Sequence, residues 1–165
     1  MLDFILSALI YIFPAYVANA SALLFGFGSP IDGNKNFFDG KPLLGKGKTW
    51  KGLFAGTCCG TLVGYVLYTF FPITNSIFLL SFLLSFGALF GDIFFSFIKR
   101  RINLKRGQPL PFIDQTDFVF GAILLTSLIY LPSIETIIFL LVLTPILHLA
   151  TNFIAYLLKL KDKPY

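Results

Sequence analysis

Five long runs of apolar residues, separated by short polar connections, make up most of this chain. They cover residues 2–27, 53–71, 77–98, 116–131 and 134–158. A helix needs about 20 residues to cross the hydrocarbon core of a bilayer, and only the fourth run falls clearly short of that length. The pattern predicts an all-α integral membrane protein of about five transmembrane helices, forming a single domain over residues 1–165. The polar connections 28–51 and 99–115 are predicted to be loops that fold over one end of the helices.

The basic residues indicate which end of the helices these loops occupy. All 13 lysines and arginines fall into three clusters, at 35–51, 99–106 and 159–163, and the connections near Pro72 and Pro132 contain none. Positively charged loops stay on the cytoplasmic side of a membrane. We therefore expect a multi-pass protein of the cell membrane with its N-terminus outside and its C-terminus in the cytoplasm.

Composition narrows the function classes further. A chain that is 56% hydrophobic and 13% charged is not typical of a water-soluble domain. The formal charge of +5 lies in the loops, where it would attract anionic headgroups or nucleotides, so we expect no nucleic-acid partner. Cys58 and Cys59 are adjacent, a spacing that suits neither a structural disulfide nor a zinc site.

Glycines mark one face of two predicted helices. Gly52, Gly56, Gly60 and Gly64 recur at every fourth residue, and Gly87 and Gly91 repeat this spacing in the third segment. Such a face has no side chains, so a neighbouring helix can approach closely. We expect close helix packing along these faces, either within the chain or in a homodimer.

Asp92 is the most unusual residue of the apolar segments. It lies six residues before the predicted end of the third segment, and Ser96 and Lys99 follow on the same helical face. A carboxylate at that depth is costly unless it is paired, hydrated or bound to a metal, so it is a candidate functional residue. The alternative is a structural ion pair with Lys99.

Two more carboxylates open the fourth segment, in the sequence Asp114-Gln115-Thr116-Asp117. They could cap the helix, with Asp114 as N-cap and Asp117 as an acidic third residue. They could also supply oxygen ligands to a divalent ion together with Asp92. The basic run at 99–106 lies between these acidic elements and is then a candidate clamp for phosphates.

The end of the first loop has the sequence GKGKTWKG at 45–52. Lys48 and Thr49 directly precede a helix, where backbone N–H groups favour anions. The alternative is an interfacial anchor, with Trp50 among the headgroups. Asn19, in the predicted cytoplasmic half of the first segment, is a further candidate for the site. We expect His148 to make a structural hydrogen bond instead.

Taken in order, these motifs resemble those of the CTP:phosphatidate cytidylyltransferase family. The resemblance rests on Gly91-Asp92, on Ser96-x-x-Lys99-Arg100 followed by Lys105, and on Asp114-x-x-Asp117, with Lys48-Thr49-x-x-Gly52 before the second segment. The compact form and the glycine-rich first loop are similar to the archaeal branch. Arg106, Gln115 and Lys51 depart from the family pattern, which usually has Asp, Arg and Glu at these positions.

The resemblance implies that a lipid phosphate attacks the α-phosphorus of CTP, and that Mg²⁺ is the cofactor. The expected lipid is 2,3-bis-O-geranylgeranylglycerol 1-phosphate, and the site is expected on the cytoplasmic side of the bilayer. Asp92 with Asp114 or Asp117 is expected to bind the metal. The expected catalytic residues are Asp92, Asp117, Lys99 and Lys105, and the expected substrate-binding residues are Asn19, Lys46, Lys48, Thr49, Ser96 and Arg100.

Two other classes of protein remain open at this point. A small ion-coupled transporter would use Asp92 as its ion site, and a membrane scaffold would bind anionic lipids through its basic loops. The gathering of unusual polar residues at one face favours the enzyme over the transporter, which needs a second gate.

Overall fold

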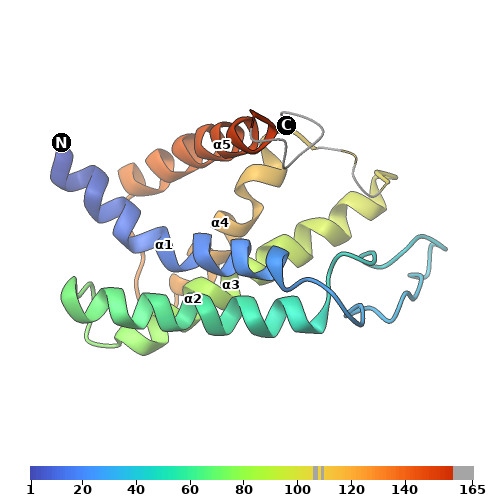
Figure 1. Ribbon diagram of the computed structural model, residues 1–165, viewed down its shortest axis with the longest axis horizontal. Coiled ribbons are helices and arrows are strands. Elements are labelled where there is room, and N and C mark those ends of the chain that lie inside the picture. The colour runs from blue at the N-terminus through green and yellow to red at the C-terminus, as the bar shows by residue number, and fades with distance from the viewer. Residues whose placement is uncertain (106–107, 109, 158–165) are drawn as a thin grey trace.

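The computed structural model describes residues 1–105, 108 and 110–157, and in these residues the chain forms five α-helices (Figure 1). The basic cluster at 159–163 and Arg106 lie outside the described residues. The all-α prediction is confirmed. In chain order the helices are α1 (Leu2–Leu24), α2 (Trp50–Phe70), α3 (Ile77–Arg101), α4 (Ile113–Thr126) and α5 (Ile134–Leu157).

The two polar loops lie at the same end of the helix bundle. Figure 1 shows the connection 25–49 at the end where α1 and α3 finish, and α4 also begins there. The N-terminus and the connections 71–76 and 127–133 lie at the opposite end. The side of the membrane that each end faces remains a prediction.

Four helices, α1, α2, α3 and α5, are long and apolar enough to cross a membrane. The fourth, α4, has 14 residues, about 21 Å of helix, which is short of the roughly 30 Å of hydrocarbon. It also begins and ends earlier than the predicted 116–131. The helix stops at Thr126 because the chain turns there, with the Tyr130 N–H donating to the Thr126 carbonyl at 2.8 Å.

Other helix boundaries differ from the prediction for local reasons. α2 begins at Trp50, three residues before the predicted start, because the Thr49 hydroxyl accepts a hydrogen bond from the Gly52 N–H at 3.1 Å and caps the helix. α3 continues past residue 98 through Lys99, Arg100 and Arg101, whose positive charges are favourable at a helix C-terminus. α1 ends at Leu24 instead of residue 27.

The glycine face of α2 packs against other helices of the same chain. All four glycines are buried. A Cβ atom at Gly60 would lie 2.7 Å from the Pro14 carbonyl oxygen of α1 and 2.5 Å from the Ser85 hydroxyl of α3. These contacts show that the glycine face packs within the chain. The same face is therefore not available to form the homodimer that the sequence suggested.

The contact between α3 and α4 is closer still. Gly87 and Gly91 of α3 face Gly121 of α4, where a Cβ atom would lie 2.2 Å from the Gly87 carbonyl oxygen. Without side chains between them, the two backbones meet directly. The approach places the turn that carries Asp117 against Gly91, one residue before Asp92.

Hydrogen bonds between helices satisfy several of the hydroxyl groups inside the bundle. The Tyr11 and Thr126 hydroxyls are 2.7 Å apart, and Tyr68 donates to the Tyr11 carbonyl at 2.6 Å. α5 is joined to α1 by the Tyr16 and Thr144 hydroxyls at 2.8 Å. Such bonds matter in an apolar environment because an unpaired polar group there costs several kcal/mol.

We predict that Gly60→Ala destabilises the protein by about 1–3 kcal/mol, because the backbone of α1 cannot move away from the added methyl group without disturbing the bundle. The measurement is the apparent melting temperature in detergent micelles. Cys58→Leu is the control, since it adds a larger side chain on the exposed face of the same helix. Equal melting temperatures for Gly60→Ala and the wild type would show that the helices are not in close contact there.

Candidate functional site

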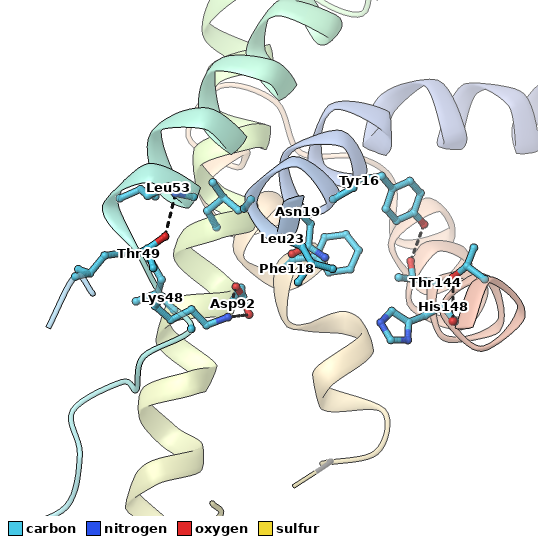
Figure 2. A pocket seen from close by; sticks show the side chains of 18 of the residues that line it. Tyr16, Asn19, Leu23, Lys48, Thr49, Leu53, Asp92, Phe118, Thr144 and His148 are labelled. Atoms are coloured by element: carbon cyan, nitrogen blue, oxygen red, sulfur yellow. Dashed lines mark hydrogen bonds and ion pairs between the residues drawn. The ribbon is translucent and has the colours of Figure 1, made fainter. Parts of the chain in front are cut away.

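A cavity of about 570 Å³ opens between the helices near the first loop (Figure 2). Every one of the five helices contributes to its wall. Its polar lining residues are Tyr16, Asn19, Lys48, Thr49, Asp92, Thr144, His148 and Thr151. Apolar side chains from all five helices and from the first loop line most of the remainder, so the cavity presents both charged and apolar surface.

An ion pair forms one wall of the cavity. The Lys48 Nζ lies 2.6 Å from Oδ1 and 2.5 Å from Oδ2 of Asp92, and Figure 2 shows the two side chains meeting from the loop and from α3. Both side chains are partly shielded, at 24% and 22% exposure, yet a ligand in the cavity can reach them. The alternative that Asp92 pairs with Lys99 was wrong, because Lys48 occupies both carboxylate oxygens.

Lys99 pairs instead with Asp114. Its Nζ lies 2.9 Å from Oδ1 of Asp114, and Oδ2 accepts a hydrogen bond from the Leu110 N–H at 3.0 Å. The suggested N-cap role of Asp114 was also wrong, since the N-cap of α4 is Phe112 and no side chain caps the helix there. Asp114 holds the start of α4 to the end of α3.

Asp117 is the buried carboxylate of the site, with 4% of its surface exposed. Its Oδ1 accepts a hydrogen bond from the Phe118 N–H at 2.7 Å. The carboxyl groups of Asp92 and Asp117 are close enough to repel each other, and Lys48 and Lys99 offset that repulsion. Two carboxylates from facing helices therefore share one region of low dielectric constant.

The structure separates the other predicted site residues into three groups. Asn19 and Thr49 line the cavity with Lys48 and Asp92. Ser96 is buried on α3, while Lys46 and Lys105 are exposed in the loops. Arg100 donates to two backbone carbonyls, that of Leu44 at 3.0 Å and that of Leu104.

No cluster of three metal-binding side chains (His, Cys, Asp or Glu) occurs within residues 1–105, 108 and 110–157. Asp114 is committed to Lys99 and to a backbone N–H. Of the three predicted metal ligands, Asp92 and Asp117 are therefore the pair that a divalent ion could bridge, with its remaining positions filled by water or substrate oxygens.

Sequence reasoning missed the polar face of α5. Thr144, His148 and Thr151 line the cavity opposite Lys48 and Asp92 (Figure 2). Their spacing of four and three residues places them on one helical face, a signal that could have been read in the sequence. His148 was expected to have a structural role only, and the structure places it at the cavity wall.

Asp32, also missed, organises the first loop. Its Oδ2 accepts hydrogen bonds from the Leu44 and Gly45 N–H groups, and its Oδ1 from the Asn34 N–H, each at 3.0 Å. Burial alone would raise the pKa of Asp32, but these N–H groups outweigh it and hold the pKa below its ordinary value. The charged carboxylate thus fixes the turn that precedes Lys48.

The chain is similar to known proteins over nearly its whole length. A family model described as CarS-like, CDP-archaeol synthase, matches residues 1–165. A CDP-archaeol synthase of Methanocaldococcus jannaschii is 46% identical over 94% of both chains, and one of Thermococcus gammatolerans is 46% identical over 96% of this chain and 95% of that one. A solved structure of an intramembrane enzyme for archaeal membrane lipid biosynthesis superposes with a TM-score of 0.83 at 36% identity, covering 89% of this chain and 93% of that one.

We predict that Asp32→Asn costs about 1–3 kcal/mol at pH 7, because an amide cannot accept all three hydrogen bonds. The measurement is the apparent melting temperature as a function of pH, with the exposed Asp3→Asn as control. Folding lowers the pKa of Asp32, so the contribution of its carboxylate to the stability of the fold is complete above the ordinary Asp pKa of about 4. That contribution is lost as the pH falls below this pKa. A difference from the wild type that grows on acidification would contradict this account.

Proposed function

The chain belongs to the CDP-archaeol synthase family, and on this premise we propose that it transfers the cytidylyl group of CTP to the phosphate of a membrane lipid. The lipid is 2,3-bis-O-geranylgeranylglycerol 1-phosphate. A phosphate oxygen of the lipid forms a bond to the α-phosphorus of CTP, the bond from that phosphorus to the bridging oxygen breaks, and pyrophosphate leaves. The product is the CDP-activated archaeal lipid, an intermediate of phospholipid synthesis.

The observation that supports this reaction most directly is the charged wall of the cavity. Asp92 and Lys48 meet at the wall of a cavity inside a bundle of apolar helices, where a lipid and a nucleotide could both reach them, and the charge of the buried Asp117 acts on Asp92. Both substrates are polyanions, and the lipid phosphate is already charged at neutral pH. The protein's task is then to bring the substrates together and to offset their charge, and no strong general base is needed.

Mg²⁺ is the cofactor we propose, and the donor set suits it. Asp92 and Asp117 would bind it, because two neighbouring carboxylates of low exposure repel each other unless a cation lies between them. When bound, Mg²⁺ supplies Lewis-acid polarisation of the phosphoryl oxygens and neutralises the developing charge.

Lys48 is the residue best placed to respond to the nucleotide. Its ammonium group pairs with Asp92, and the residue directly precedes Thr49, the N-cap of α2. Backbone N–H groups in the first turn of α2 point towards the loop end of the bundle, where they favour anions. With a divalent ion held by Asp92, the ammonium group of Lys48 would be free to bind phosphate oxygens. Lys99 is close enough to act on Asp117 and stabilises negative charge there.

The remaining predicted residues take more peripheral roles. Lys46 and Lys105 lie exposed in the two loops, where they would attract the nucleotide and bind the departing pyrophosphate. Asn19 lines the cavity and can hydrogen-bond a substrate there. Ser96 is buried beside the site and Arg100 is held by the backbone, so we propose that both support the site from behind.

The proposed reaction also requires that the cavity be open to CTP and that the lipid chains have an apolar surface to lie against. By the positive-inside rule, the basic loops would lie on the cytoplasmic side together with the neighbouring cavity, which is the side where CTP is found. α5 is largely exposed, since only 11% of its residues Ile134–Thr151 are buried. Its outer face and that of α1 therefore offer the lipid chains an apolar surface. An ion-coupled transporter is not supported by any of the comparisons.

We predict that Asp92→Asn and Asp117→Asn each lower the turnover rate by at least about 10²-fold, because each would remove a ligand of the cation that offsets the charge of the reacting phosphates. Asp114→Asn should have a smaller effect, since Asp114 binds Lys99 and not the substrates. The measurement is lipid-dependent release of pyrophosphate by purified protein in detergent with Mg²⁺ and CTP. Asp3→Asn is the matched control. Wild-type turnover by Asp92→Asn would exclude the proposed role of the acidic pair.

Removal of divalent ions should abolish turnover, and added Mg²⁺ should restore it. Binding provides a second test that does not need turnover: Mg²⁺ with CTP should raise the melting temperature of the wild-type protein, because a ligand stabilises the folded state that binds it. Neither Asp92→Asn nor Asp117→Asn should show the full increase. An equal increase in all three proteins would place the metal elsewhere.

A further inference from the structure

Arg101, at the last residue of α3, holds the tip of the first loop. Its guanidinium lies against two aromatic rings that contact each other edge to face, 4.8 Å from the ring centroid of Phe37 in the loop and 4.8 Å from that of Phe97 in α3. One nitrogen, Nη1, is 2.5 Å from Oδ1 of Asp39, and the other, Nη2, donates to the Pro42 carbonyl. In return, Lys41 donates to the Arg101 carbonyl at 2.8 Å.

The loop is thus attached to α3 at more than one place. The arginine clasp, which we define as Arg101 with Phe37, Asp39 and Phe97, fixes the tip of the loop, and the ion pair of Lys48 with Asp92 fixes its end. Arg101 and Asp92 are nine residues apart on one helix, about 13 Å along its axis. Arg101 is not among the residues that line the cavity.

Hydrogen bonds connect the two attachments through the loop. Beyond Pro42, the Leu44 carbonyl accepts from Arg100, and the Leu44 and Gly45 N–H groups donate to Asp32. The Gly45 carbonyl then accepts from the Lys48 N–H at 3.2 Å. Displacing the loop at Arg101 would therefore disturb the turn that directs Lys48 towards Asp92.

We propose that Arg101 is a positioning residue for nucleotide binding, acting by holding the first loop in the conformation in which Lys48 reaches the cavity. The inference rests on the proposed function and adds a residue that the family motif does not use. Arginine suits this role better than lysine, because its guanidinium can contact two aromatic rings and still donate to a carboxylate and to carbonyls through separate N–H groups.

The clasp makes a specific kinetic prediction. If the loop opens without it, only a fraction of the protein is ready to bind CTP, and the apparent affinity falls by that fraction. At saturating CTP the contacts of the nucleotide with Lys48 hold the loop in place again. The KM for CTP should therefore rise while kcat stays near the wild-type value, whereas partial unfolding would lower kcat and leave KM unchanged.

The experiment compares Arg101→Gln, Arg101→Lys and Asp39→Asn with the wild type in the pyrophosphate-release assay. An open fraction of about nine-tenths would raise the KM of Arg101→Gln about tenfold. Arg101→Lys should give an intermediate KM, since it keeps a positive charge near the two rings. Asp39→Asn should have the smallest effect, because an ion pair with partly exposed members contributes little by itself.

Lys35→Gln is the matched control. It removes one positive charge from the same loop, but the Lys35 side chain is exposed and outside the clasp, so it reports the loss of long-range attraction alone. A KM for Arg101→Gln no higher than that of Lys35→Gln would overturn the proposal, and so would a loss confined to kcat.

Hydrogen exchange tests the clasp without relying on turnover. The amides of Leu43, Leu44 and Gly45 are hydrogen-bonded within the loop, so Arg101→Gln should expose them to faster exchange and Lys35→Gln should not. Unchanged exchange in Arg101→Gln would overturn the proposal. If faster exchange occurred in a protein that releases no pyrophosphate even as wild type, the clasp would stand and the proposed function would fail.

Discussion

The electrostatic cost of carboxylates inside an apolar helix bundle is the constraint on which the rest of this structure depends. Asp92 and Asp117 lie on facing helices, where a charged carboxylate is costly unless a cation lies nearby. Lys99 of α3 is paired with Asp114, so the cation that contacts Asp92 comes from a loop. Lys48 fills this need, and much of the conformation of the first loop serves to bring it to Asp92.

The close approach of the helices creates this constraint in the first place. Gly91 and Gly121 let α3 and α4 meet backbone to backbone, and so the turn with Asp117 is pressed against the turn with Asp92. Side chains at these positions would hold the helices apart and move the carboxylates away from each other. Residues that contribute no chemistry of their own thus determine the separation of those that do.

The first loop keeps its shape with little regular secondary structure. Between Gly28 and Thr49 it has two isolated β-bridges, and its order comes mainly from Asp32 inside the loop and from Arg100 and Arg101 outside it. A charged loop at a membrane surface cannot rely on an apolar core of its own. Charge-assisted hydrogen bonds to one rigid helix replace that core.

The sequence by itself determined the helical class, the approximate segments and the gathering of basic loops at one end, because hydropathy and charge follow from composition along the chain. It also marked Asp92, since a carboxylate in an apolar segment is costly wherever its partners lie. Only the tertiary structure decided those partners. Lys48 instead of Lys99 pairs with Asp92, Arg100 binds backbone carbonyls, and the glycine faces meet within one chain. These outcomes depend on distances between residues far apart in the chain, which no local pattern of residues records.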